Sequence, residues 1–187
     1  MQSQRKREVR SSYDTLTGRI YDLRYEEEQG EKYDLLLEKI DLQQGQLVLD
    51  DGCGTGLLMR RVEGWVVGLD LSAALLSSAA SSLEGKPNSY LVQADSDFKP
   101  FRARVFHNLF SVTLIQNMPD PLETLREMRR VGRPCSRVVV TALKKAFSLD
   151  DFTRILRESG LSEVEILKDE RTRDWMALAE NDHDEMV

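Results

Sequence analysis

The spacing of apolar and polar positions changes near Gly45. From Arg19 to Ile40 apolar residues recur among charged ones at roughly helical spacing, which predicts one or two helices with breaks at Gly18 and Gly30. After Gly45 short apolar runs alternate with helical stretches, a pattern typical of βαβ units and a parallel sheet. We therefore expect N-terminal helices followed by an α/β core.

The short apolar runs predict seven strands with helices between them. The strands are expected near residues 46–51, 65–70, 89–94, 105–112, 136–142, 161–167 and 173–180. Capping residues delimit two of the helices, because Ser72 precedes the helix 73–83, and Ser148 and Gly160 flank the helix 149–159. The predicted fold is of the α/β class, a doubly wound, mostly parallel seven-stranded sheet with N-terminal helices.

Length and composition favour a single globular domain. The 187 residues suit one core better than two, and 41% hydrophobic and 31% charged residues are ordinary values for a globular protein. We expect 1–44 to form a helical lid segment, 45–180 the α/β core and 181–187 an acidic tail. The net charge of -6 provides no general positive field for nucleic acid.

Cysteine usage and hydropathy bear on the location of the protein. The spacing of Cys53 and Cys135 suggests neither a disulfide framework nor a zinc site, and no metal is expected. No 18 apolar residues run together, and the basic stretch 1–10 is not followed by an apolar segment of signal-peptide length. We expect a cytoplasmic protein with no membrane contact.

The segment from Gln46 to Gly56 carries the strongest chemical signal. An apolar strand runs into alternating glycines at 52, 54 and 56, and the next apolar run ends in Asp70. Glycine tolerates positive φ and lets a ligand approach the backbone, so the loop is expected to present its amides to a ligand. The carboxylate of Asp70 has two acceptor oxygens for the two hydroxyls of a ribose. This pattern predicts a nucleoside site beyond the first two strands.

A nicotinamide dinucleotide is the less favoured nucleoside ligand. Its fingerprint is G-x-G-x-x-G, whereas Leu57 stands here at the third glycine position. Asp50 and Asp51 directly precede the loop, where two negative charges oppose a pyrophosphate. A ligand with a cationic amine fits better, and an NAD-dependent oxidoreductase remains the weaker alternative.

At these residues the chain resembles the class I S-adenosylmethionine-dependent methyltransferases. Their first motif is an acid, any residue and G-x-G-x-G after an apolar strand, which Asp50 to Gly56 matches in full. The resemblance covers about residues 46–178 and continues through Val67–Ser72, Ala94–Asp95, Pro100–Phe101, Leu109–Pro121 and Gly132–Val140. It implies S-adenosyl-L-methionine as cofactor and methyl transfer as activity.

The resemblance also implies a role for each part of the site. Asp50 and the glycine loop would hold the methionine part and Asp70 the ribose, while Asp95 with Ser96 would hold the adenine. Val112 and Thr113 would line the methionine side near the sulfonium. The expected cofactor residues are Asp50, Gly52, Cys53, Gly54, Gly56, Asp70, Leu71, Asp95, Ser96, Val112 and Thr113.

Candidates on the acceptor side are less specific, and no catalytic residue is predicted. The front segment carries tyrosines that either close over the cofactor or pack against a helix face. Gln116 either forms a hydrogen bond to a substrate or caps a turn. Lys144 could bind an anionic substrate. The tyrosines are Tyr13, Tyr21 and Tyr25.

Two positions depart from the family pattern. Family members commonly carry an aspartate where His107 stands, and a pair of glycines where Cys135 and Ser136 stand. We interpret His107 as a surface histidine at a strand entrance, with a substrate-side base as the alternative. Cys135 is interpreted as a tolerated turn substitution.

The sequence leaves the methyl acceptor open among small molecules, RNA and protein. The Asn-Pro-Pro-Tyr type motif of enzymes that methylate planar amide or exocyclic nitrogens is absent, because residues 113–117 read Thr-Leu-Ile-Gln-Asn. A partner subunit or a homodimer is possible, and the alternative to an active enzyme is a cofactor-binding, non-catalytic subunit of a larger assembly.

Overall fold

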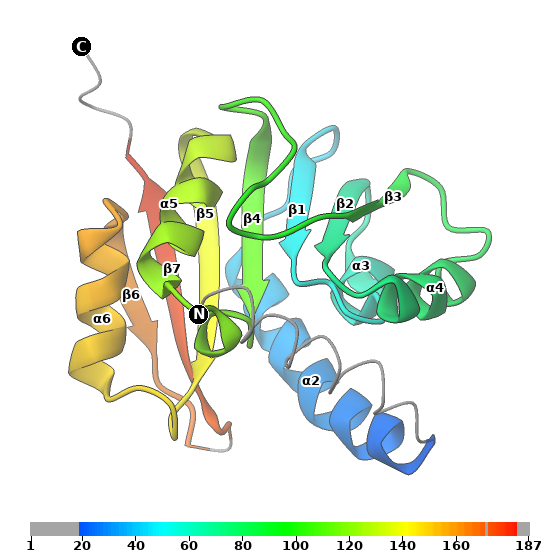
Figure 1. Ribbon diagram of the computed structural model, residues 1–187, viewed down its shortest axis with the longest axis horizontal. Helices are drawn as coiled ribbons and strands as arrows, with labels where there is room; N and C mark the ends of the chain where they lie inside the picture. Colours follow the sequence, from blue (N-terminus) through cyan, green and yellow to red (C-terminus); the bar gives the residue numbers. More distant parts are fainter. Residues whose placement is uncertain (1–18, 171, 183–187) are drawn as a thin grey trace.

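The computed structural model describes residues 19–170 and 172–182, with side chains from residue 29 onward. One seven-stranded sheet crosses the molecule in the order β3-β2-β1-β4-β5-β7-β6 (Figure 1). The strands are β1 (Leu47–Asp51), β2 (Trp65–Asp70), β3 (Ser89–Gln93), β4 (Phe106–Val112), β5 (Gly132–Leu143), β6 (Ser162–Leu167) and β7 (Asp174–Asn181). Strands β1 to β5 pair in parallel, and β7 runs antiparallel to both of its neighbours. The predicted seven-stranded, mostly parallel sheet is confirmed.

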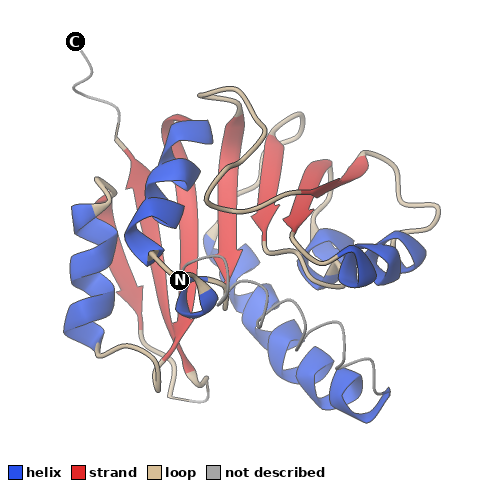
Figure 2. Ribbon diagram, viewed as in Figure 1, coloured by secondary structure: helices blue, strands red, loops and turns tan. Residues whose placement is uncertain are grey.

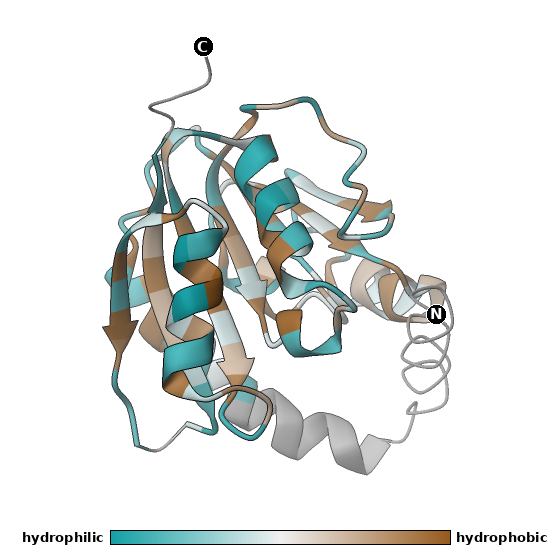
Figure 3. Ribbon diagram, turned by 60° about the vertical axis from the view of Figure 1, so that its left-hand side comes forward, coloured by the Kyte–Doolittle hydropathy of each residue, from teal (hydrophilic) through white to brown (hydrophobic). Residues whose placement is uncertain are grey.

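Helices lie on both faces of this sheet (Figure 2). They are α2 (Arg19–Lys39), α3 (Leu57–Arg61), α4 (Ala73–Ser82), α5 (Pro121–Val131) and α6 (Leu149–Glu158), with a short 3-10 helix, η1 (Ile115–Asn117), after β4. Figure 3 shows bands of hydrophilic and hydrophobic residues along α5 and α6, as expected for helices with one face on the sheet.

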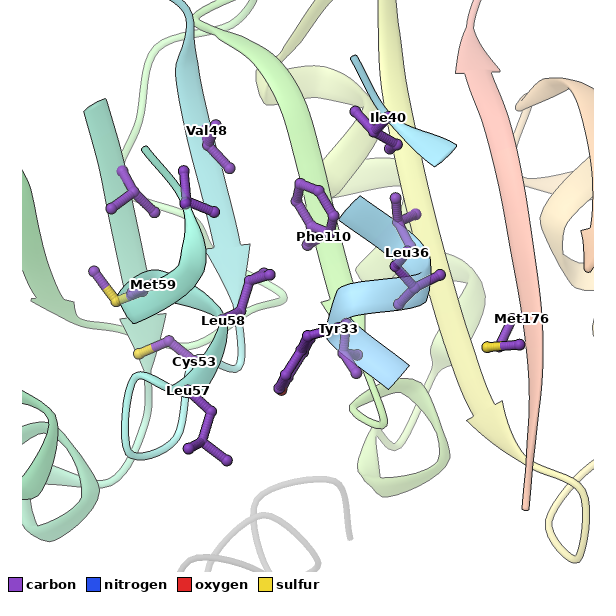
Figure 4. Packing of buried hydrophobic residues seen from close by; sticks show 14 of the residues in the cluster. Tyr33, Leu36, Ile40, Val48, Cys53, Leu57, Leu58, Met59, Phe110 and Met176 are labelled. Carbon is purple, nitrogen blue, oxygen red and sulfur yellow. The ribbon is translucent and has the colours of Figure 1, made fainter. Parts of the chain in front are cut away.

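The strands form two hydrophobic cores because successive side chains point to opposite faces of the sheet. Val48 lies in the core that α2, α3 and α4 cover, whereas its neighbour Leu49 lies in the core that α5 and α6 cover. In the first core Tyr33 and Leu36 of α2 lie beside Phe110 of β4 (Figure 4). The central strands are therefore apolar on both faces, which explains their runs of valine and leucine.

The predicted helix caps are confirmed. The hydroxyl of Ser72 accepts a hydrogen bond from the amide of Leu75 at 3.3 Å, and that of Ser148 accepts one from the amide of Asp151 at 3.1 Å. Gly160 follows α6 with φ 88, the left-handed conformation expected of a glycine after a helix.

Two sequence predictions about element bounds are wrong. Gly30 does not break the front helix, because α2 continues through it, and a Cβ there would lie 2.7 Å from Nη2 of Arg61. The glycine thus leaves room for the guanidinium group of Arg61. Strand β5 begins at Gly132 instead of residue 136, since Gly132 already pairs with Phe106 before a bulge. The predicted break at Gly18 lies outside the described residues.

Candidate functional site

The glycine loop follows β1 at the carboxyl edge of the sheet. Strand order reverses between β1 and β4, and open α/β sheets bind ligands at such a switch point. Gly52, Gly54 and Gly56 all have positive φ, at 82, 54 and 80. Other residues rarely adopt that conformation, so the three glycines are required by the turn itself.

The loop amides donate within the protein, contrary to the expectation that they face a ligand. The amides of Gly52 and Cys53 both donate to the carbonyl of Leu69, at 2.8 and 3.0 Å. The amide of Gly54 donates to Oδ2 of Asp70 at 2.9 Å, and that of Gly56 to the carbonyl of Cys53. The turn is therefore attached to the end of β2, which places Asp70 against it.

Close packing beneath the loop depends on a glycine that sequence reasoning did not single out. A Cβ at Gly68 of β2 would lie 2.9 Å from Sγ of Cys53 and would also collide with Met59. The Cys53 side chain is buried in the first hydrophobic core, where Figure 4 shows it beside Met59. The Cys53 thiol thus contributes to packing beneath the loop.

Asp70 retains hydrogen-bonding capacity toward a ligand. Its Oδ1 accepts from the amide of Ser72 at 2.8 Å and its Oδ2 from Gly54, while the side chain stays half-buried. A carboxylate offers about four acceptor positions, so capacity remains for a donor of the ligand. Burial raises the pKa of Asp70, and the backbone amides of Ser72, Gly54 and Leu71 partly oppose that rise.

Asp50 is buried and incompletely satisfied. The residue is 2% exposed, and its Oδ2 has no hydrogen-bond partner among the described residues. Burial raises the pKa of Asp50 well above its ordinary value, and the negative charges of Asp51 and Asp70 raise it further. A cation beside this carboxylate would relieve both effects.

Asp51 is compensated inside the protein by Lys99, a pairing that sequence reasoning missed. Nζ of Lys99 lies 2.9 Å from Oδ2 of Asp51, with both side chains fully buried. The Ser96 hydroxyl donates to Oδ1 of Asp51 at 2.7 Å, and Nζ of Lys99 donates to the Ser96 carbonyl at 2.6 Å. Ser96, predicted to contact the adenine, thus has its hydroxyl bonded to Asp51. The sequence signal for this pair was the adjacent acids Asp50 and Asp51, because buried carboxylates require a cation nearby.

The expected adenine side lies between β2 and the end of β3. Asp95 follows β3, is half-buried, and accepts a hydrogen bond from the amide of Asp97 at 3.0 Å. Leu71 is also half-buried, and its carbonyl accepts from the side-chain amide of Gln93. The structure therefore brings Asp70, Leu71 and Asp95 to neighbouring strand ends, β2 and β3, of one sheet edge.

The end of β4 closes the other side of the site. Val112 is buried, and Thr113 is a non-glycine residue with φ 58. Its hydroxyl contacts Lys32 of α2 and Asp174 of β7. The side-chain amide of Gln116 donates to the Thr113 carbonyl, which favours its interpretation as a turn cap.

The remaining acceptor-side candidates are placed as follows. Nζ of Lys144 donates to the carbonyls of Asp169 and Thr172 and lies 5.2 Å from the centre of the Trp175 ring, so its charge is engaged by the loop before β7. Tyr13, and the side chains of Tyr21 and Tyr25 on α2, lie outside the described residues.

The two departures from the family pattern lie at the opposite edge of the sheet. Nδ1 of His107 accepts from the amide of Leu47 at 3.0 Å, at the amino ends of β1 and β4, and Nε2 lies 3.0 Å from Arg133. Burial and Arg133 lower the pKa of His107. Cys135 is exposed with φ 57, before the regular part of β5. Neither residue is near the glycine loop.

A family model described as "Methyltransferase domain" matches residues 49–140, a range that contains the glycine loop, the Asp70 strand end and the β4 loop. This match supports a class I S-adenosylmethionine-dependent methyltransferase, as the sequence motifs imply. A curated methyltransferase is similar in sequence: "2-phytyl-1,4-naphtoquinone methyltransferase" of Thermosynechococcus vestitus is 35% identical over 112 residues, 57% of this chain and 50% of that protein. The chain thus spans about half the length of this relative.

Solved structures match the fold over more of the chain. A SAM-dependent methyltransferase from Aquifex aeolicus superposes with a TM-score of 0.74 at 19% identity, covering 91% of this chain and 97% of that one. A putative methyltransferase from Haloferax volcanii, solved in complex with the Trm112 methyltransferase activator, gives 0.78 at 18% identity, with 91% and 98% covered. At these identities the two structures establish only that this chain has the same fold.

The described part of the chain carries neither a metal cluster nor a membrane-spanning helix. Among the side chains of residues 29–170 and 172–182, no group of three or more histidine, cysteine, aspartate or glutamate residues is placed to hold a metal ion. Within the same residues, no helix combines the length and the apolar character that crossing a membrane requires.

Proposed function

We propose that this protein transfers a methyl group from S-adenosyl-L-methionine to an acceptor. The observation that carries the proposal is the buried, incompletely satisfied carboxylate of Asp50 beside the glycine loop, together with the open acceptor capacity of Asp70. Asp50, Asp51 and Asp70 lie together with Lys99 as the buried cation, so the site favours a positively charged ligand. S-adenosyl-L-methionine carries both an ammonium and a sulfonium, and the residues present fit it.

The roles that we propose for the residues are those that the family resemblance implies. Asp50 would accept the cationic amine of the methionine part, Asp70 the ribose hydroxyls, and Asp95 with Leu71 would flank the adenine. Val112 and Thr113 at the end of β4 would line the methionine side. When bound, the cofactor supplies an electrophilic methyl group on its sulfur. The protein then aligns the acceptor and excludes water, and such alignment can supply roughly 7 to 11 kcal/mol without an acid or base.

A nicotinamide dinucleotide fits these residues poorly. Leu57 is buried at the position where the dinucleotide fingerprint has its third glycine. Asp51 and Asp70 already raise the pKa of Asp50, and a pyrophosphate would add further negative charge beside these three acids.

Calorimetric titration tests the proposal. The protein should bind S-adenosyl-L-methionine and S-adenosylhomocysteine and leave NAD unbound. Asp70→Ala should weaken S-adenosyl-L-methionine binding by about 1.5 to 3 kcal/mol, because a charge-assisted hydrogen-bond acceptor for the ribose is lost. The matched control is Asp41→Ala, which removes an exposed carboxylate far from the loop and should leave the dissociation constant unchanged. Binding of NAD alone, or an unchanged constant in Asp70→Ala, contradicts the assignment.

We propose a small organic molecule as the first acceptor class to screen, since the name of the similar Thermosynechococcus vestitus protein specifies a naphthoquinone. A radiolabelled methyl donor with fractionated metabolites, RNA and protein as acceptors tests this. Label in RNA or protein alone would exclude the small-molecule class.

The second candidate function is that of a subunit that acts with a partner chain. It has support from the Haloferax volcanii structure, which was solved with a methyltransferase activator. Light scattering of the purified protein would distinguish a homodimer from a monomer, and turnover that appears only when a small activator protein is added would favour the second candidate. We also propose a cytoplasmic location, because Cys53 and Cys135 are both free thiols.

A further inference from the structure

A buried polar cluster joins α2 to the carboxyl edge of the sheet. Lys32 of α2 and Asp174 of β7 form an ion pair, with side chains 3% and 1% exposed. Nζ of Lys32 also donates to Oε1 of Gln29 and to the Thr113 hydroxyl, each at 3.0 Å. An ammonium group has three donors, so all three N–H bonds of Lys32 have acceptors.

Thr113 occupies the centre of this cluster. Its hydroxyl accepts from Lys32 and donates to Oδ2 of Asp174 at 3.1 Å. The Thr141 hydroxyl of β5 accepts from the Thr113 amide at 2.9 Å and lies 3.4 Å from the same Oδ2. Thr113 is β-branched with φ 58, a conformation that persists only where surrounding contacts hold it. The cluster supplies these contacts.

The residue after Thr113 transmits this placement to the glycine loop. A Cβ built on Gly52 would lie 3.0 to 3.3 Å from the Leu114 side chain, so Leu114 rests directly on the loop that follows β1. An unbroken series of contacts therefore runs from Lys32 and Asp174 through Thr113 and Leu114 to Gly52. The partners of the ion pair are 142 residues apart in sequence.

We propose that Lys32 and Asp174 are positioning residues that hold the Thr113–Leu114 segment against the glycine loop and so tune affinity for the methionine part of the cofactor. The inference rests on the proposed function. The competing explanation is that the pair only attaches α2 to the sheet, as the Asp34–Arg61 ion pair attaches it to α3. The two differ in which ligand atoms the pair affects.

The test replaces the pair by apolar residues and compares two ligands. In the double variant Lys32→Met/Asp174→Leu no buried charge is left unpaired, so the protein should remain folded. The dissociation constant of S-adenosylhomocysteine should rise about tenfold, a size typical of contact networks that modulate a site. Adenosine lacks the methionine part and should bind within twofold of the unaltered protein, about the noise of such comparisons.

Hydrogen exchange provides a readout that needs no ligand. Amides of residues 113–117 should exchange faster in the double variant while those of β1 and β2 keep their protection. The matched control is Arg137→Gln, which removes an exposed ion pair with Glu180 between the same strands β5 and β7. It should change neither measurement.

A second pair of variants keeps the test valid if the double variant fails to fold. Thr141→Ser keeps the hydroxyl that accepts from the Thr113 amide and should retain affinity for S-adenosylhomocysteine, whereas Thr141→Val keeps the shape, loses the hydroxyl and should lose affinity. Equal weakening of S-adenosylhomocysteine and adenosine, or equal behaviour of the Ser and Val variants, would overturn the proposal. If the unaltered protein binds neither ligand, the proposed function fails instead, and the exchange of 113–117 alone decides whether the pair holds this segment.

Discussion

Asp50 combines burial with an oxygen that lacks a partner, which is unfavourable for folding. Burial and two neighbouring acids raise the pKa of Asp50, so the charged form of this residue destabilises the native state. Such an unfavourable buried acid is expected at a binding site, where a cationic ligand would neutralise its charge. At this residue, stability and the proposed binding function oppose each other.

The pH dependence of stability tests this interpretation. A carboxyl group with a raised pKa in the folded state binds protons more tightly there than in the unfolded chain, so stability falls as pH rises from the ordinary value of 3.8 through the folded pKa. Without ligand, Asp50→Asn should therefore increase the free energy of unfolding at pH 8 by about 1 to 3 kcal/mol and reduce its decline with pH.

Urea denaturation at pH 5 and pH 8 measures both quantities. The control Asp41→Asn changes an exposed carboxyl group and should leave the curve unaltered. A lower stability of Asp50→Asn at pH 8 would contradict the interpretation.

Individual residues of the site could be proposed from the sequence only where a local pattern marks them. Asp50 and Asp70 end apolar runs beside a glycine loop, and both were identified. Lys99 and Gly68 were missed, because their importance depends on what lies across the fold: Asp51 for the lysine, Cys53 and Met59 for the glycine. The roles of the predicted site residues in ligand binding remain predictions.

At the scale of elements, Lys99 connects three segments of the carboxyl edge. Its ammonium reaches Asp51 at the end of β1 and the Ser96 carbonyl after β3, and lies 3.5 Å from the Thr124 carbonyl of α5. The loop after β3 is thus held against the glycine loop by a buried charge pair.

Removal of that lysine should be strongly destabilising. Lys99→Met leaves the buried Asp51 carboxylate without its cation and should lower the free energy of unfolding by about 3 to 5 kcal/mol. Urea denaturation measures the effect. The control Lys145→Met alters an exposed lysine and should change stability by less than about 0.5 kcal/mol. Adding Asp51→Asn to Lys99→Met should recover part of the loss, and no recovery would argue against the charge pair as the cause.

Elements were predictable to different degrees. Helix α6 was predicted with its flanking residues Ser148 and Gly160, because capping signals are local. The start of β5 was not, because pairing with Phe106 across the sheet extends it to Gly132. Gly30 signals a helix break in isolation, yet in the fold it makes room for Arg61.

At the scale of the molecule, one continuous sheet connects the part of the protein around β2 with the part around β7. Trp65 lies on β2 near one edge and Trp175 on β7 near the other, and these are the two tryptophans of the chain. Both hydrophobic cores extend along several strands of the sheet. We therefore expect a single cooperative unit.

Fluorescence of single-tryptophan variants tests cooperativity. Trp65→Phe leaves the probe on β7 and Trp175→Phe leaves the probe on β2. In each variant, the urea midpoint from fluorescence should coincide with that from far-UV circular dichroism, because a two-state domain loses all structure together. Separate midpoints within one variant would indicate two folding units and contradict the single domain.

The sequence by itself determined the order and type of the elements, the glycine loop and the acids at the ends of the first strands. These features depend on periodicity and on local conformational preference, which short stretches of chain carry in full. The tertiary structure alone decided that Lys32 meets Asp174 and that Lys99 meets Asp51. A buried ion pair has no local signature, since its partners come together only when the strands between them have formed the sheet.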